Sequence, residues 1–205
     1  MQVNKISLYF DPVCPWTYIS SKWLRQVSKE LQIPLEFRPF SLALKNKGVE
    51  VPPEHKAPLE LGLSLLRVVA ELGKTPSGVN QDLISNLYKE FGRQFHENKM
   101  HDLNFPALLA KFEIDPELYQ NLNNDELDKL IELEMETALS LTGDDVGVPI
   151  LCIETDTDVK GFFGPILCRM PTGSEVLDLW EHIIGLSSLG CFFEIKRKKV
   201  GTPIF

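Results

Sequence analysis

The chain has 205 residues, of which 43% are hydrophobic and 24% are charged, and its formal net charge is −8. This length allows one globular core with an insertion, whereas two fully independent domains would be cramped. Because an acidic chain repels phosphate backbones and anionic lipids, we expect neither a nucleic-acid partner nor a membrane surface.

The N-terminal segment MQVNKISLYFDPVCPW does not resemble a signal peptide. Its apolar stretch is interrupted by Asp11 and Pro12, and no small-residue cleavage site follows. No later run approaches the roughly 18 consecutive apolar residues of a membrane-spanning helix. The four cysteines form no C-x-x-C pair, which argues against a zinc site and a disulfide framework. We therefore expect a cytoplasmic protein with free thiols and no metal.

A strand, a helix and a second strand are predicted at the start of the chain. Residues 5–10, KISLYF, are mostly apolar and stop at Asp11, as expected for a buried central strand. Pro15 suits the first position of a helix, where the missing N–H would be unpaired anyway. An apolar residue then recurs every four positions, at Ile19, Trp23, Val27 and Leu31. Residues 34–40 alternate in polarity and predict a second strand, parallel to the first.

Only helices are predicted between Phe40 and Val146, which is about half of the chain. Apolar spacing indicates helices over residues 65–72, 83–91, 105–112 and 124–141. The Lys-, Pro- and Glu-rich stretch from Leu44 to Pro58 is expected to be a mobile loop. Since a simple crossover needs little more than one helix, residues 41–146 are predicted to form an inserted helical subdomain.

Strand patterns return near the end of the chain. Residues 149–153 and 160–164 are separated by a polar turn, which predicts an antiparallel hairpin. Thr172-Gly-Ser-Glu175 has the pattern of a capping box before an amphipathic helix. The expected fold is therefore α/β, with β-α-β and β-β-α units from residues 1–40 and 147–205 around the helical insertion.

Cys14 carries the sharpest chemical signal, because it falls at the N-cap of the first predicted helix. Unpaired N–H groups and the helix dipole stabilise an anion there, so we expect the pKa of this thiol to be depressed. The alternative is a small buried hydrophobic residue without reactivity.

The segment FDPVCPWTY, the order of elements and the segment Gly147-Val-Pro-Ile150 together resemble the DsbA-like branch of the thioredoxin superfamily. Further segments are similar to the mycothiol-dependent nitroreductase family: SLALKN (41–46), LLRVVAELG (65–73), GRQFHE (92–97), GFFGPI (161–166) and FFEIKRKK (192–199). The resemblance implies a thioredoxin-like fold, DsbA-like in its large helical insertion, and identifies Cys14 with the nucleophilic cysteine.

The same resemblance implies a binding site around Cys14. Pro149 corresponds to a proline held in the cis form, which leaves the Val148 backbone free to pair with a substrate or thiol. Pro15 and Trp16 would flank the thiol, and Asn46 would line the pocket. The alternatives are a trans proline at a strand start, a tryptophan that fills the core and an ordinary loop asparagine.

One position departs from the dithiol relatives, because Thr17 stands where they have a second cysteine. The site therefore cannot release a mixed disulfide by attack from within the motif. Another thiol must do so, most simply a low-molecular-weight thiol of the mycothiol or glutathione type. The Thr17 hydroxyl is suited to donate a hydrogen bond to the Cys14 thiolate, although a packing role is the alternative.

We therefore predict a thiol-dependent oxidoreductase that forms a Cys14 mixed disulfide and reduces nitro or other electrophilic substrates. The alternatives are a glutathione-dependent isomerase or transferase of the kappa or 2-hydroxychromene-2-carboxylate type, and a non-catalytic binding module. A homodimer is compatible with the sequence. The remaining candidates are expected to be uninvolved: Cys152 in the core, Cys168 and Cys191 near element ends, and a solvated basic run at Lys196–Lys199. The alternative for Cys168 and Cys191 is that one of them resolves a disulfide. His96 is expected to face solvent, and the alternative is that it faces the pocket.

Overall fold

A four-stranded sheet in the order β2-β1-β3-β4 organises the fold. The structure is a computed structural model that describes residues 2–73 and 80–205, so Met1 and residues 74–79 of the predicted domain ranges lie outside the described residues. The strands are β1 (Val3–Phe10), β2 (Leu35–Pro39), β3 (Ile150–Thr155) and β4 (Val159–Phe163). β1 pairs in parallel with β2 and antiparallel with β3, and β3 pairs antiparallel with β4. The predicted mixed α/β fold is confirmed.

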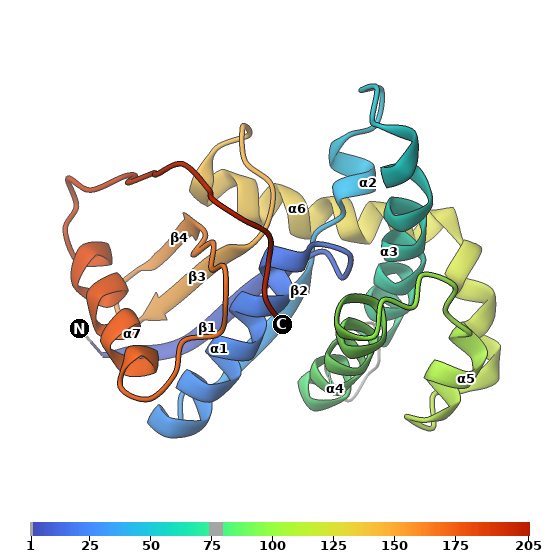
Figure 1. Ribbon diagram of the computed structural model, residues 1–205, viewed down its shortest axis with the longest axis horizontal. Helices are drawn as coiled ribbons and strands as arrows, with labels where there is room; N and C mark the ends of the chain where they lie inside the picture. The colour runs from blue at the N-terminus through green and yellow to red at the C-terminus, as the bar shows by residue number, and fades with distance from the viewer. Residues whose placement is uncertain (1, 74–79) are drawn as a thin grey trace.

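Helices cover both faces of this sheet (Figure 1). α1 (Pro15–Leu31) packs against α7 (Glu175–Ser187), and the Trp23 indole donates a 2.9 Å hydrogen bond to the Val176 carbonyl. α6 (Asp128–Thr142) contacts β2, β3 and β4. β1 is buried from Ile6 to Phe10, as a central strand between two helical layers must be.

The region between β2 and β3 is helical, but two of its predicted boundaries are wrong. Its helices are α2 (Leu42–Lys45), α3 (Pro53–Leu72), α4 (Gln81–Gly92), α5 (Phe105–Ala110) and α6. α3 begins at Pro53, which occupies the first helical position, so the expected loop up to Pro58 is partly helix. The helix expected from residue 124 begins at Asp128, because two 3₁₀ segments precede it, η2 (Pro116–Asn123) and η3 (Asp125–Leu127).

The start of α7 also differs from the predicted capping box. Its N-cap is Ser174, whose side chain makes no capping hydrogen bond. The Glu175 carboxylate instead accepts a 2.9 Å hydrogen bond from the Thr172 backbone N–H. Only the acidic half of the capping box therefore forms, because the helix begins at Glu175 itself.

Aromatic and cationic side chains fasten α4 to the sheet and to α1. The Tyr88 ring stacks on Phe10 at 4.2 Å between centroids, and the Arg25 guanidinium lies 4.2 Å from the Phe37 ring centre. Arg25 also donates a 2.8 Å hydrogen bond to the Ser85 carbonyl. The helical region is thus held against the strand that leads to Cys14.

The C-terminal segment after α7 returns to α1 without regular secondary structure (Figure 1). The Ile204 N–H donates a 2.8 Å hydrogen bond to the Cys168 carbonyl, and Ile204 forms an isolated bridge with Arg169. We call residues 188–205 the tail. Its end lies near the first turn of α1.

Candidate active site

Cys14 is the N-cap of α1, as predicted. It has extended backbone angles, and Pro15 occupies the first turn. The Cys14 N–H donates to the Asp11 carbonyl at 3.0 Å, while the Cys14 carbonyl accepts from the Tyr18 N–H at 3.1 Å. The chain therefore leaves β1, makes one tight turn and presents the thiol at the mouth of the helix.

The Val148–Pro149 peptide bond is cis and lies beside this thiol. Cys14 Sγ is 3.7 Å from the Val148 carbonyl oxygen, to which it donates a weak hydrogen bond. Cys14 is 6% exposed and Val148 is equally buried. The predicted cis bond and its place against the Cys14 loop are confirmed.

The expected depression of the Cys14 pKa is wrong for the resting protein. Burial is the largest influence and raises the pKa of this thiol above its ordinary value. The Thr17 hydroxyl and the backbone N–H groups of Thr17 and Trp16 lower the pKa, but they do not outweigh the loss of water. The Thr17 side chain is fully buried, and within the described residues its hydroxyl has no hydrogen-bond partner.

Asp11 is part of the site, although the sequence suggested only that it stops a strand. Its carboxylate is fully buried and accepts hydrogen bonds from the Val13 N–H at 3.0 Å and the Leu42 N–H at 2.7 Å. Burial raises the pKa of Asp11 to about 7, and its negative charge raises the pKa of Cys14. The available signal was an acidic residue placed directly after an apolar strand.

His96 was expected to face solvent, and this is wrong. It lies on the π-helical turn η1 (Arg93–Glu97) and is 7% exposed. Its Nε2 is 2.8 Å from the Pro12 carbonyl, and since a carbonyl only accepts, Nε2 carries the proton. Burial lowers the pKa of His96 to about 4, so the ring is neutral near pH 7. π-turns of this kind are frequent at functional sites.

Of the remaining candidate residues, Pro15 and Trp16 belong to the first turn of α1, whereas Asn46 lies at the end of α2. Pro15 and Trp16 are half-buried. Asn46 ends α2, and its backbone N–H bonds to the Leu42 carbonyl at 3.0 Å. Asp11 holds the Leu42 N–H, so it connects the start of this short helix to the Cys14 loop. The roles predicted for these three residues stay predictions.

All four cysteines are free. Cys152 is buried in β3, where burial raises its pKa to about 12, whereas Cys168 and Cys191 are exposed. Residues 2–73 and 80–205 contain no group of three or more His, Cys, Asp and Glu side chains placed to hold a metal ion. None of the described helices is long and apolar enough to span a membrane.

Solved structures share the fold of this chain. DsbA from Pseudomonas aeruginosa has a TM-score of 0.51 at 17% identity, with 90% of this chain and 84% of that chain covered. The cytosolic disulfide reductase DsbM from Pseudomonas aeruginosa, solved with GSH, has a TM-score of 0.52 at 12% identity, with 88% and 97% covered. The thioredoxin-like, DsbA-like architecture is thus confirmed.

Sequence comparisons extend this likeness to a family. The chain is 28% identical over 204 residues to "Uncharacterized protein Rv2286c" of Mycobacterium tuberculosis, covering 96% of this chain and 83% of that protein. Residues 13–197 match the Rv2466c-like family, described as mycothiol-dependent nitroreductase Rv2466c. That match includes Cys14, Thr17 and Pro149. The chain is therefore an enzyme of the thiol-dependent oxidoreductase class and belongs to the Rv2466c-like family of mycothiol-dependent nitroreductases.

Proposed function

We propose that Cys14 is the nucleophile of this enzyme and that it forms a mixed disulfide with a low-molecular-weight thiol. One observation carries the proposal: the Cys14 sulfur stands at the N-terminus of α1, 3.7 Å from the carbonyl that precedes cis-Pro149. The unpaired N–H groups of the helix stabilise charge that develops on this sulfur. The family name supports a small thiol as the co-substrate.

The covalent step is a thiol–disulfide exchange. The Cys14 thiolate attacks one sulfur of an oxidised thiol, the old S–S bond breaks, and the departing thiolate takes up a proton. Thr17 cannot attack the resulting mixed disulfide, so a second small thiol must release Cys14. Pro15, Trp16 and Asn46 would line the thiol site.

Nitro compounds and other electrophiles are the substrates that we propose. Reduction of a nitro group to a nitroso group takes two electrons and two protons, and it releases water. Two thiol molecules supply these as they become joined in a disulfide, with Cys14 as the intermediate partner. The backbone of Val148 would pair with the substrate, as the residue before a cis proline is free to do. A reducing compartment such as the cytoplasm suits four unpaired cysteines.

Intact-mass analysis after incubation with oxidised glutathione, bacillithiol and mycothiol tests the proposal. Cys168 and Cys191 are exposed and can react without selectivity, so the double variant Cys168→Ser, Cys191→Ser is the proper background. We expect one adduct, mapped to Cys14, which disappears in Cys14→Ser. An unmodified Cys14 with every oxidised thiol would contradict the proposal.

One observation favours a second function, a thiol-dependent isomerase or transferase without disulfide turnover. Burial raises the pKa of Cys14, and the buried Thr17 hydroxyl, which has no partner within the described residues, would pair with a cofactor thiolate only if that thiolate entered beside Cys14. Such an enzyme would convert its substrate without consuming the thiol. Measurement of thiol consumption per product formed distinguishes the two functions.

A further inference from the structure

Ser20 joins α1 to the segment that follows β4. It lies one turn after Trp16 and is fully buried, and its hydroxyl oxygen is 2.6 Å from the Pro165 carbonyl. Within the described residues, the one other acceptor of this hydroxyl is the Trp16 carbonyl, 3.1 Å away on the preceding turn. Because a serine hydroxyl has a single proton, it donates to the nearer carbonyl, that of Pro165. A buried serine of α1 therefore ties this helix to a residue 145 positions later in the chain.

The segment that Ser20 holds is also the one that contacts Pro149. We call residues 164–166 the Pro165 loop, and they end the segment GFFGPI. The Gly164 N–H donates a 2.8 Å hydrogen bond to the Pro149 carbonyl, which extends the pairing of β3 with β4 by one residue. The residue before Pro149 is Val148, whose carbonyl oxygen lies 3.7 Å from Cys14 Sγ. The Pro165 loop therefore helps to set the position of the Val148 backbone beside the thiol.

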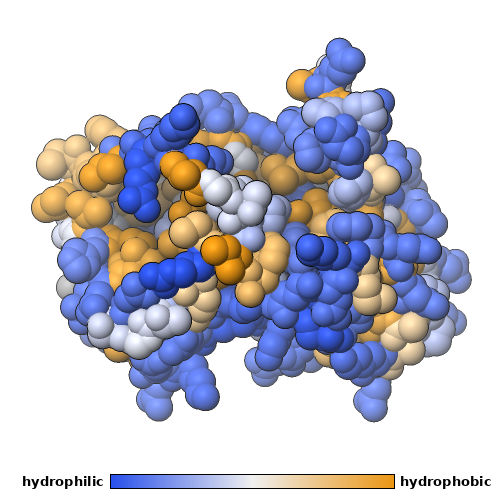
Figure 2. All heavy atoms as spheres, in the orientation of Figure 1, coloured by the Kyte–Doolittle hydropathy of each residue, from blue (hydrophilic) through white to orange (hydrophobic). Residues whose placement is uncertain are grey.

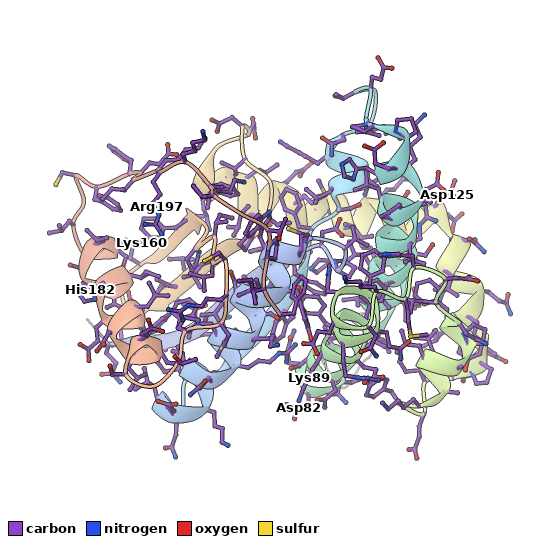
Figure 3. All side chains as sticks on the ribbon, viewed as in Figure 1. Asp82, Lys89, Asp125, Lys160, His182 and Arg197 are labelled. Carbon is purple, nitrogen blue, oxygen red and sulfur yellow. The ribbon has the colours of Figure 1, made fainter. Side chains whose placement is uncertain are left out.

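These contacts form a closed ring around the Cys14 sulfur, and Ser20 is the point where its two sides meet. One side is the first turn of α1, and the other is the end of the β3–β4 ladder. Away from the site, β4 is anchored to α7, because Lys160 donates a 2.8 Å hydrogen bond to the Ser187 carbonyl (Figure 3). Figure 2 shows hydrophobic side chains gathered over β4 and α7. Since hydrophobic packing is non-directional, the approach of the Pro165 loop to α1 depends on the Ser20 hydrogen bond.

We propose that Ser20 is a positioning residue for the reaction at Cys14. By holding the Pro165 loop, it keeps the Val148 backbone in place to pair with the disulfide or thiol that reacts there. This inference rests on the proposed mixed disulfide. Ser20 contacts none of the reacting atoms, so the exchange itself is unchanged: Cys14 attacks one sulfur of a disulfide, the mixed disulfide forms, and the other half leaves as a thiolate that takes up a proton.

The contribution of Ser20 is pre-organisation. Without its hydroxyl, the Pro165 loop and the Val148 backbone would have to be ordered when a ligand binds, and this cost slows the reaction with a ligand that pairs with them. A small alkylating reagent such as iodoacetamide requires only an accessible thiolate, so the same loss should not slow alkylation. The position of the backbone and the reactivity of the thiol can therefore be measured separately.

Two reactions of Cys14, compared in the Cys168→Ser, Cys191→Ser background, test the inference. Ser20→Ala should lower the rate constant of mixed-disulfide formation roughly threefold to tenfold, the range for one net hydrogen bond. The disulfide used is oxidised mycothiol, bacillithiol or glutathione, whichever forms the wild-type adduct. Alkylation by iodoacetamide should be at least as fast as in the wild type. Hydrogen exchange of the Gly164 amide should become faster, because its acceptor is held less firmly.

Ser21→Ala is the matched control. Ser21 is the next residue of α1 and is also fully buried, but its hydroxyl donates a 2.7 Å hydrogen bond to the Tyr18 carbonyl of its own helix. This variant should therefore keep the wild-type ratio of the two rate constants. An unchanged ratio in Ser20→Ala, or a parallel fall of both rates, would overturn only this inference, since the Cys14 adduct would still form. A wild-type Cys14 that forms no adduct with any of the three disulfides would overturn the proposed function and this inference with it.

Discussion

Two buried side chains within one turn of Cys14 act on its sulfur in opposite directions. The Asp11 carboxylate raises the pKa of the thiol, and the Thr17 hydroxyl lowers it. Both follow from the motif Asp11-Pro-Val-Cys-Pro-Trp-Thr17, in which a strand end and a first helical turn enclose the cysteine. Because Cys14 is buried, water does not stabilise its thiolate. The reactivity of this thiol therefore depends on the balance between Asp11 and Thr17.

Replacement of Thr17 by valine tests the hydroxyl. The Thr17→Val variant keeps the shape of the side chain but removes a hydroxyl that lowers the pKa of Cys14, so this pKa should rise by about one unit. The free energy of unfolding should not fall, because this hydroxyl is buried without a partner in the resting protein. Alkylation rate against pH and denaturant unfolding measure the two effects. An unchanged pKa would mean that the hydroxyl does not reach the sulfur.

A cysteine at the same position tests the requirement for an outside thiol. Two cysteines that bracket Pro15 and Trp16 on a first turn can form a disulfide, so the Thr17→Cys variant should close one. Release of a Cys14 adduct should depend on added thiol in the wild type. In the variant release becomes intramolecular, with an effective concentration on the order of millimolar or higher. Quenched mass spectrometry follows this release. Thiol-independent release in the wild type would point to Cys152, Cys168 or Cys191 as a resolving cysteine.

The local motif predicts part of the site and misses the rest for a physical reason. Cys14, its N-cap position and the cis bond before Pro149 follow from short segments. The burial of Asp11 depends on the Leu42 N–H, which lies in a later helix. The burial of His96 depends on the π-turn η1 and on the Pro12 carbonyl, which lies far away in the sequence, so no local pattern indicates it.

At the scale of elements, the junction between α4 and α1 depends on Gly92. A Cβ at this position would lie 2.2 Å from the Tyr18 ring, so the two helices approach only because the residue is glycine. In the π-turn η1 that follows Gly92, His96 donates a hydrogen bond to the Pro12 carbonyl. Glu97 of the same turn accepts a 2.9 Å hydrogen bond from the Tyr18 hydroxyl. The position of the Cys14 loop and that of α4 are therefore coupled through this junction.

Gly92→Ala should force α4 and α1 apart and lower the free energy of unfolding by about 1–3 kcal/mol. It should also slow alkylation or adduct formation at Cys14, because the Pro12 contact shifts. Gly185→Ala in α7 is the control: apart from its chain neighbours and the backbone of its own helix, no described atom lies within 4 Å of its added Cβ, so the helix should gain up to about 1 kcal/mol. Equal behaviour of the two variants in thermal unfolding would show that the junction is not tightly packed.

Regular apolar spacing located α3 and α4, whereas the 3₁₀ segments before α6 escaped prediction. Asn124 ends η2, and its side chain accepts a 3.2 Å hydrogen bond from the Glu126 N–H. This local polar contact, and not apolar packing, sets the direction of the backbone between η2 and α6. No apolar repeat encodes such a contact. We propose that residues 41–146 act as an inserted helical subdomain joined to the sheet domain through Gly92 and Arg25.

At the scale of the whole molecule, Asp11 and His96 give the stability opposite dependences on pH. Folded Asp11 keeps its proton to about pH 7, whereas the unfolded carboxyl loses it near 3.8. The folded state thus binds more protons between these values, and Asp11 lowers stability by about 1.4 kcal/mol per pH unit as pH rises. Folded His96 takes a proton only near pH 4 and the unfolded ring near 6.5, so His96 raises stability with pH in that window.

Between about pH 4 and 6.5 the contributions of Asp11 and His96 to the free energy of unfolding nearly cancel. Replacing either residue should therefore reveal the pH dependence that the other one causes. Asp11→Asn leaves His96 uncompensated, so its unfolding free energy should fall by about 3 kcal/mol as pH drops from 6.5 to 4. His96→Gln leaves Asp11 uncompensated, and its unfolding free energy should instead fall by a similar amount as pH rises through the same window. The pH slope, measured by denaturant unfolding, separates this effect from any uniform loss caused by altered hydrogen bonds. Parallel pH profiles for wild type and both variants would show that neither group keeps a shifted pKa in the folded protein.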